Sequence, residues 1–316
     1  MRAEHLERKE RCCLESVRVR FLLFACALFL IFSLPSAAYA DGALKDAGVT
    51  AKKVRQLLSE YSPDALYIIN HSGSSDEEIL RYWNSGNVLT DCIDTMVHEE
   101  FHVLTGRRIP NARSEAIYIG NGKRTVIHFT PLIDSSETAA TIPQSNRTFR
   151  FNTYIMGSNS ASNKLGVYGL LNEFGAYCWG LDTTVSLFPY FRQHAENYDD
   201  WYRFIVEGEN DRNAYAEFLY WTLNYLEFTR VYHRDVYDKI MSNKKYVRTV
   251  KKINRHFAQK IRQYEEYHSW ISSSYPNRSY SYRITDAYEL LRPAINADQF
   301  AVVRRKLGIA LLPQYR

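Results

Sequence analysis

The stretch TDCIDTMVHEEFHVLT, residues 90–105, has the apolar spacing of an amphipathic helix. Thr90 or Asp91 can cap its start, and Gly106 and Pro110 predict its end. Its core-facing side chains would be Ile93, Met96, Val97 and Phe101. We therefore predict a half-buried helix that presents one polar face.

The polar face of this helix carries the sequence HEEFH, with His98, Glu99 and His102. Residues four apart in a helix lie one turn apart on the same side, so both imidazoles can bind one metal ion. A Glu beside two such His ligands can take a proton from a water that the metal activates. The spacing therefore predicts a Zn²⁺ site with Glu99 as general base.

A third ligand is needed, because a catalytic zinc normally has three protein ligands. No further His follows His102 at short spacing. Glu173 is the first candidate, since a Glu in the apolar stretch LLNEFGAY is costly to bury unless it is paired or metal-bound. The alternative for Glu173 is a buried ion pair with an Arg. Glu217, in the apolar stretch AYAEF, is the rival ligand.

Tyr177 lies one helical turn after Glu173 and on the same face. A phenol there could donate a hydrogen bond to an oxyanion or orient a ligand. The alternative is ordinary packing, because the chain has 24 Tyr. His128 and His233 fit structural or surface positions better than catalytic ones.

The HExxH motif, followed by a helical Glu in an N-E-x-x-A-Y setting, resembles the gluzincin-type zinc metallopeptidases. This resemblance implies that His98, His102 and Glu173 bind zinc, that Glu99 is the base, and that the substrate is a peptide or protein. It covers the ligand helices only. The spacing departs from the thermolysin-like pattern, because 70 residues separate His102 from Glu173.

The rest of the chain predicts an α+β fold, mostly helical, with a small central sheet and a helical C-terminal half. The resemblance implies that this fold is zincin-like. A single domain is expected over 41–316, with strands up to about residue 185 and helices over 186–316. The expected helices are 44–60, 75–84, 164–180, most of 187–271, and 286–307 with an interruption at Pro293; the expected strands are 65–70, 115–119, 125–129 and 150–156; residues 134–147 are expected to be loop.

The first forty residues have the pattern of a secretory signal peptide. Residues 21–34 form an apolar run of fourteen residues, which is short for a membrane-spanning helix of about 20 residues. Basic residues precede this run, and the small-residue pattern ending at Ala40 follows it. We expect cleavage after Ala40, a secreted or periplasmic protein of 276 residues, and no membrane span in that mature chain. The alternative is an uncleaved N-terminal anchor.

Composition fits a globular protein, with 46% hydrophobic and 24% charged residues, and excludes collagen-like and extensively disordered classes. A net charge of +5 gives no reason to expect nucleic acid as the main partner. Cys92 and Cys178 would remain after export, where a disulfide between them is one of two options and free thiols the other.

The leading functional hypothesis is an exported zinc hydrolase that acts on peptide bonds. An edge strand of the central hairpin could pair with an extended substrate. One alternative is a non-catalytic binding or envelope protein on a peptidase-like scaffold. Another is a zinc amidase that acts on cell-wall material, because the water-activating chemistry is the same.

Overall fold

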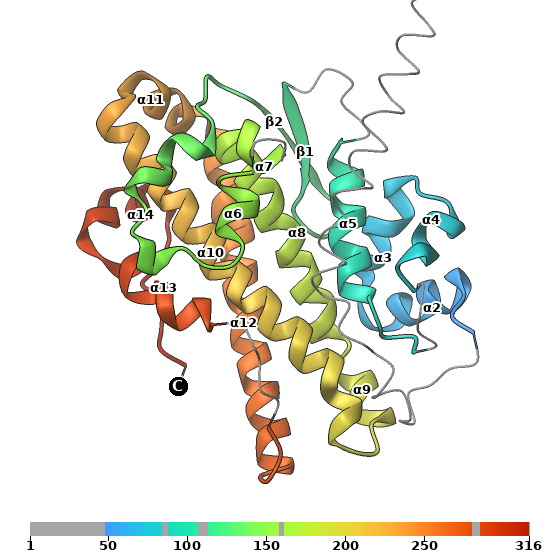
Figure 1. Cartoon of the computed structure of the whole chain (residues 1–316). Coiled ribbons are helices and arrows are strands. Elements are labelled where there is room, and N and C mark those ends of the chain that lie inside the picture. Colours follow the sequence, from blue (N-terminus) through green and yellow to red (C-terminus); the bar gives the residue numbers. More distant parts are fainter. Residues whose placement is uncertain (1–47, 84–87, 107–112, 158–160, 280–284, 316) are drawn as a thin grey trace, which may run out of the picture. The chain divides into compact units, whose positions relative to one another are not determined.

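Helix α8 (Gly166–Ser186) lies in the middle of the fold, with α5 (Ile93–Gly106) on one side and α10 (Tyr202–Tyr232) on the other (Figure 1). The computed structural model describes residues 48–83, 88–106, 113–157, 161–279 and 285–315. Nearly every residue of α8 is buried, as its continuous apolar sequence requires. Contacts within the chain group Gly42–Arg316 into one unit.

The other elements surround these three helices. The α-helices are α2 (Ala51–Tyr61), α3 (Pro63–Ser72), α4 (Asp76–Leu80), α6 (Phe151–Tyr154), α7 (Ala161–Lys164), α9 (Phe188–His194), α11 (Arg234–Ser242), α12 (Lys244–Ser274), α13 (Ala287–Asn296) and α14 (Ala301–Leu307). Short 3₁₀ turns are η2 (Arg81–Trp83), η3 (Ser135–Thr141), η4 (Gln144–Asn146), η5 (Tyr198–Trp201) and η6 (Asp298–Phe300). The prediction of a mostly helical chain with a small antiparallel sheet is confirmed.

A glycine sets the distance between α5 and α8. A Cβ atom added at Gly175 would lie 2.6 Å from Cζ of Phe101, so only glycine leaves room for that ring. Phe101, the fourth residue of the HEEFH motif, is fully buried there. The close approach therefore brings the polar face of α5 against the polar positions of α8.

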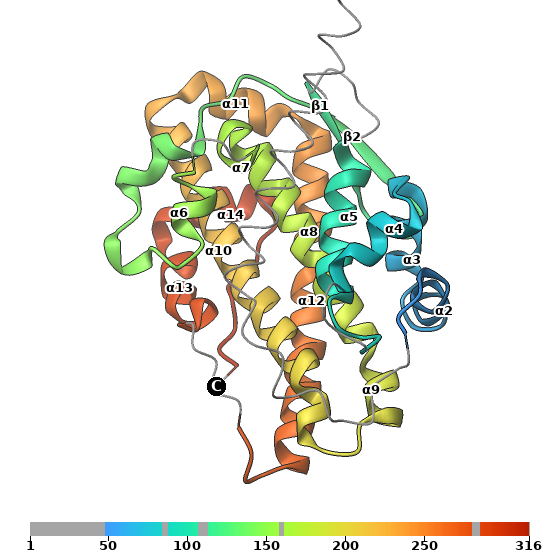
Figure 2. The same cartoon turned by 45° about the vertical axis from the view of Figure 1, so that its right-hand side comes forward.

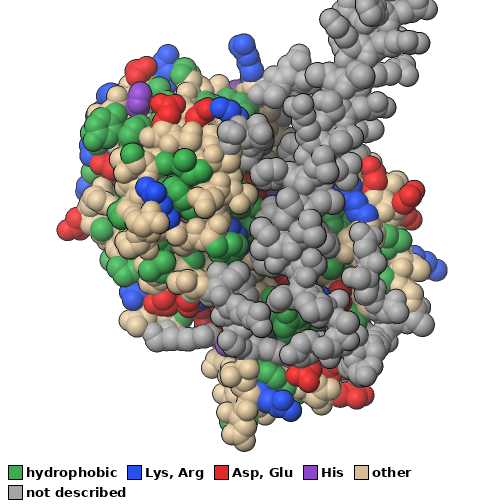
Figure 3. All heavy atoms as spheres, in the orientation of Figure 1, with side chains coloured by type: hydrophobic (Ala, Val, Ile, Leu, Met, Phe, Trp, Pro, Cys, Tyr) green, Lys and Arg blue, Asp and Glu red, His purple; other side chains and the backbone are tan. Residues whose placement is uncertain are grey.

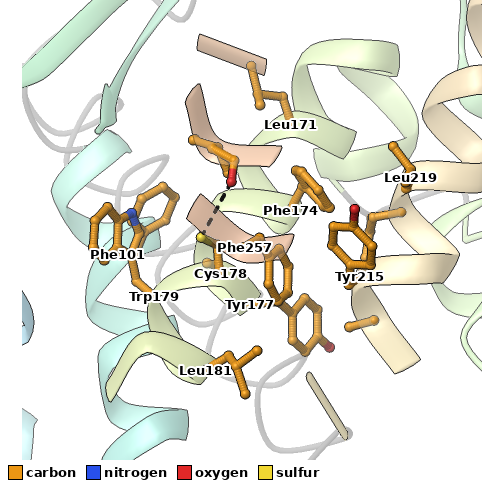
Figure 4. Packing of buried hydrophobic residues seen from close by; sticks show 14 of the residues in the cluster. Phe101, Leu171, Phe174, Tyr177, Cys178, Trp179, Leu181, Tyr215, Leu219 and Phe257 are labelled. Carbon is orange, nitrogen blue, oxygen red and sulfur yellow. Dashed lines mark hydrogen bonds between the residues drawn. The ribbon is translucent and has the colours of Figure 1, made fainter. Parts of the chain in front are cut away.

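Aromatic rings fix the opposite side of α8 against α10 and α12. Phe174 packs on Tyr215 of α10 and Phe257 of α12, with ring centroids 5.7 and 5.2 Å apart, respectively (Figure 4). Tyr215 and Phe257 also contact each other edge to face, at 5.0 Å. Such aromatic contacts stabilise a fold beyond the area that they bury. They hold α8 rigidly, and α8 in turn positions its polar residues.

The sheet is one antiparallel hairpin, β1 (Ser114–Tyr118) and β2 (Arg124–His128), beside α5 (Figures 1 and 2). Ala116 pairs with Val126, which confirms the predicted hairpin. In the turn of the hairpin, Asn121 has a positive φ of 55°, and its N–H donates to the carboxylate of Asp64 in α3 at 2.9 Å. The hydroxyl of Tyr118 donates to the same carboxylate. These bonds fasten the turn to α3.

Two predicted strands are helices. Residues 65–70 belong to α3, which begins with Pro63 in its first turn and ends at Gly73 in the left-handed conformation. Residues 151–154 of the predicted strand 150–156 form α6. A short apolar run fits either structure, and in α3 the buried positions follow a helical spacing. Residues 134–147, predicted as loop, contain η3 and η4.

The predicted break at Pro293 is also misplaced. Pro293 lies inside α13, and that helix ends at Asn296. Ala297 then takes an extended conformation before η6 and α14 continue the chain. The closing helical region is therefore divided four residues later than its sequence predicted.

The predicted signal peptide, residues 1–40, lies outside the described residues. Among the described residues, no helix combines the length and the apolar character needed to cross a membrane.

Candidate metal centre

The two imidazoles of the HEEFH motif face each other on one side of α5. Nε2 of His98 and Nε2 of His102 are 3.1 Å apart. The rings are nearly perpendicular, with centroids 4.8 Å apart. Both nitrogens therefore converge on one point, as the helical spacing predicts.

Glu173 of α8 adds a carboxylate oxygen to this pair. Its Oε2 lies 3.7 Å from Nε2 of His98 and 3.4 Å from Nε2 of His102. These three side chains are 13 to 16% exposed, while Oε2 of Glu173 itself is buried. The rival Glu217 is fully buried elsewhere and pairs with Arg150 at 2.5 Å. The buried ion pair with an Arg, which was the alternative for Glu173, is formed by Glu217 instead.

The three ligand atoms suit a zinc ion in distance and chemistry. Atoms that bind zinc tetrahedrally at about 2.0–2.2 Å lie roughly 3.3–3.6 Å from one another, close to the three separations in this cluster. Oε2 of Glu173 is buried and makes no hydrogen bond within the described part of the chain. Such an atom is costly to bury without a partner, and a cation would supply one. Among the described residues, this is the one cluster of His, Cys, Asp or Glu with metal-binding spacing.

Asn172 holds the imidazole of His102 in place. Nδ1 of His102 is 2.5 Å from Oδ1 of Asn172, and Nδ2 of Asn172 donates to Oγ1 of Thr105 at 2.9 Å. With its oxygen as the acceptor, Asn172 requires a proton on Nδ1 and leaves Nε2 directed at Glu173. The sequence analysis assigned no role to Asn172, although it directly precedes Glu173.

The two histidines differ in protonation when no metal is bound. Burial and the neighbouring His102 lower the pKa of His98 well below its ordinary value. Burial acts the same way on His102, but the carboxylate of Glu173 outweighs it and raises the pKa of His102 to about 9. One shared positive charge therefore lies between the imidazoles and Glu173, where a metal ion would replace it.

Glu99 is half-buried beside the cluster. Burial raises the pKa of its carboxyl group, the positive charge of His102 lowers it, and Glu173 raises it further. Arg81 of η2 lies close enough to interact with Glu99, and it donates to the hydroxyl of Tyr82 at 2.6 Å. A carboxylate with a raised pKa is suited to accept and return a proton near neutral pH.

Glu115 of β1 is a further carboxylate at the cluster that the sequence analysis missed. Its side chain bonds to Asn172 and interacts with His102 and Glu173. Burial raises the pKa of Glu115 to about 7. The signal in the sequence was a Glu within an otherwise apolar strand, EAIYI.

The ring of Tyr177 lies against the cluster, while its hydroxyl group bonds to residues outside the cluster. Its ring packs edge to face on His98, with centroids 4.4 Å apart. Nε of Arg150 donates to its oxygen at 3.2 Å, and the hydroxyl of Tyr154 lies 3.1 Å away. Burial raises the pKa of Tyr177 to about 12, so the phenol keeps its proton at neutral pH.

The predicted disulfide option is wrong, because Cys92 and Cys178 are both free thiols. Cys178 points from α8 toward α12, where its Sγ lies 3.9 Å from the carbonyl oxygen of Ile253 (Figure 4). Cys92 precedes α5 and interacts instead with Arg203 of α10. The two side chains thus face different helices.

The remaining histidines considered from the sequence lie outside the cluster. His128 ends β2, and its carbonyl oxygen accepts a hydrogen bond from Asn243 at 2.8 Å. His233 precedes α11, and its ring packs on Phe228. Both fit the structural or surface roles expected of them.

No protein-family model, no curated protein and no solved structure matches this chain. The cluster on α5 and α8 is therefore interpreted from its own geometry.

Proposed function

We propose that the protein is a zinc-dependent hydrolase of peptide bonds, built on a zincin-like scaffold. The supporting observation is the convergence of His98, His102 and Glu173 on one point, where the buried Oε2 of Glu173 has no hydrogen-bonding partner among the described residues. Two helices far apart in sequence supply these groups. Glu99, the residue next to the first ligand, supplies the acid–base group that the chemistry needs.

Each residue has a defined task in this proposal. Bound zinc would polarise a carbonyl group and lower the pKa of a coordinated water to about 7. The carboxylate of Glu99 accepts a proton from the attacking water and then returns this proton to the leaving nitrogen. Asn172 keeps Nε2 of His102 directed at the ion. Tyr177, which accepts a hydrogen bond from Arg150, donates a hydrogen bond to the oxyanion and keeps its proton.

We propose that this activity is used outside the cytoplasm, after removal of residues 1–40. The pattern of basic flank, short apolar run and small residues before Asp41 supports this. Intact mass and N-terminal sequencing of protein recovered from an exporting host should give a chain that begins at Asp41. A recovered chain that still contains residues 21–34 would favour the anchored alternative.

Glu99→Gln is the decisive variant for the mechanism. It removes the base and leaves the three ligands unchanged, so we expect about one zinc per chain and a loss of hydrolysis of at least 10²-fold. Glu100→Gln is the matched control, because Glu100 is buried one residue further on and faces no metal ligand in the proposal. Metal content is measured by mass spectrometry and hydrolysis with fluorescently labelled, unfolded casein.

Three outcomes would contradict the proposal in different ways. Unchanged hydrolysis in Glu99→Gln would remove Glu99 as the base. Purified protein without stoichiometric zinc would favour the binding or envelope protein. Zinc without casein hydrolysis, together with release of peptides from cell-wall material, would favour the amidase.

A further inference from the structure

The outer side of α12 carries a row of basic residues. Every exposed residue of this helix from position 244 to 262 is Lys or Arg, with Gln259 as the exception, and no acidic residue occurs in this segment. These basic residues, which we call the α12 stripe, are Lys244, Lys245, Arg248, Lys252, Arg255 and Arg262. From Lys245 to Arg255 they are three or four residues apart, and Arg262 follows two turns later, which places them along one face of the helix.

The opposite face of α12 fixes the orientation of the stripe. Tyr246, Ile253 and Phe257 form part of the buried face of α12, and the backbone of Ile253 contacts Cys178 of α8. Lys260, at the edge of that buried face, pairs with Asp182 of α8 at 2.9 Å. The helix cannot rotate without exposing this apolar side, so the stripe stays in solvent.

The stripe is not neutralised within the described part of the chain. None of its six cations forms an ion pair there. Some exposed cations elsewhere are paired along their own helices, as Arg234 is with Asp238 at 2.9 Å, while others such as Lys52 and Lys123 stand singly in the described structure. On the face shown in Figure 3, acidic and basic side chains are interspersed. An unbalanced row of this kind attracts anions over a range of several ångströms.

We propose that the α12 stripe binds an anionic lipid surface. The stripe spans about 27 Å on one straight, exposed helix, so it can meet a plane but offers no groove that would follow a polymer strand. No aromatic side chain is exposed between its cations, whereas binding of single-stranded nucleic acid uses such rings for stacking. Each basic residue near an anionic leaflet strengthens binding about fivefold.

This attachment leaves the candidate metal centre accessible. Asp182, which contacts α12, lies nine residues after Glu173 on α8, or about 180° around the helix. The metal cluster and α12 therefore occupy opposite faces of α8. A protein that lies on a membrane through α12 would turn its cluster away from that surface. The inference stands whether or not the cluster binds zinc.

The test is co-sedimentation of the full chain with vesicles of phosphatidylcholine, with and without 30 mol % phosphatidylglycerol. The triple variant Arg248→Gln, Lys252→Gln, Arg255→Gln should lose about a hundredfold in its partition coefficient on the anionic vesicles. The difference between the two vesicle types gives the charge-dependent part of binding, to which the basic residues of 1–47 also contribute. The share of the stripe is the change in this difference between the wild type and the triple variant. Raising the salt concentration to 1 M should abolish that difference, because the Debye length falls to about 3 Å.

A matched control removes three exposed cations that lie off the stripe, Lys52, Lys123 and Arg278, each changed to Gln. This control has the same net charge as the stripe variant and should bind anionic vesicles like the wild type. Circular dichroism checks that both variants are folded. Equal loss in both variants, or equal binding of the wild type to both vesicle types, would overturn the proposal. Stripe-dependent binding to heparin without binding to vesicles would also overturn it and would identify a polyanion as the partner.

Discussion

At the scale of single residues, the contact between His102 and Asn172 determines how well the cluster could hold a metal ion. Nδ1 of His102 bonds to Asn172, and that amide is itself anchored on Thr105. The imidazole therefore reaches a metal already oriented, without a loss of rotational freedom on binding. Asn172 is at the same time the link to Glu115 of β1, so one side chain joins three elements.

Asn172→Ala should weaken zinc binding about 10- to 100-fold, because His102 would lose the group that orients it. Asn70→Ala is the control, since Asn70 is exposed on α3, where its side-chain oxygen accepts a hydrogen bond from Arg55 at 3.2 Å. Competition with a chromophoric chelator measures both affinities. Equal affinity in the two variants would show that the Asn172 contact does not position the ligand.

Tyr177→Phe tests the proposed role of Tyr177 as a hydrogen-bond donor to the substrate. The variant keeps the ring that packs on His98 and removes the hydroxyl. We expect unchanged zinc content and a decrease in kcat of about 10²-fold with a smaller change in KM, because an oxyanion donor acts mainly in the transition state. Tyr154→Phe, which removes the neighbouring hydroxyl, is the comparison. A larger loss in Tyr154→Phe than in Tyr177→Phe would contradict the assignment.

At the scale of elements, the sequence predicted what local patterns determine. The helix predicted at 90–105 is present as α5 (Ile93–Gly106), and so is the hairpin, because apolar spacing and turn glycines are local signals. The cap predicted at Thr90 or Asp91 was placed too early, since α5 begins only at Ile93. The strand predicted at 65–70 was wrong, since a short continuous apolar run does not distinguish the two structures. The sequence favoured Glu173 over Glu217 as the third ligand but could not decide between them, for a different reason. Both occupy buried helices, and the Arg150 that neutralises Glu217 comes from a distant segment.

Gly175→Ala should disturb the contact between α5 and α8. The added methyl group would overlap Phe101, and relieving the overlap costs about 1–3 kcal/mol of unfolding free energy and separates Glu173 from the imidazoles. Gly106→Ala is the control, because a Cβ there meets no atom within 4 Å. Urea unfolding and zinc titration provide the two readouts. Retained zinc affinity in Gly175→Ala would mean that α5 and α8 adjust independently of the ligands.

At the scale of the whole molecule, a second group of buried carboxyls affects stability. Asp94 of α5 bonds to Glu207 of α10, and Asp211 lies nearby with Oδ2 lacking a hydrogen-bonding partner in the described structure. Burial raises the pKa of all three. The charged groups facing them are Arg203, Arg150 and Asp91, and Asn210 donates to Asp211.

These carboxyl groups make stability depend on pH in a definite direction. Below a pH of about 3 they are protonated in both the folded and the unfolded chain, so they add no pH dependence to the free energy of unfolding. As pH rises toward the raised pKa of the folded state, the unfolded chain releases protons that the folded chain retains. The free energy of unfolding then falls, by up to about 1.4 kcal/mol per pH unit for each retained proton.

Asp211→Asn should therefore flatten the fall in stability between pH 5 and pH 8. Asp298→Asn, at an exposed position, is the control and should follow the wild type. Urea unfolding is measured with a zinc chelator present, so that loss of metal at low pH does not contribute. A parallel pH dependence in wild type and Asp211→Asn would exclude Asp211 as a source of the effect.

The separation of the ligands along the chain has a consequence for the order of assembly. His102 and Glu173 are 71 positions apart, so they meet only after α5 and α8 have docked. An unfolded chain offers the two His of one turn but no third ligand, and it holds zinc weakly. If the cluster binds zinc as proposed, the ion would be acquired only after α5 and α8 have docked, and a chain that crosses a membrane unfolded would take it up from the compartment it enters. Release of the ion during unfolding would then report directly the step at which α5 separates from α8.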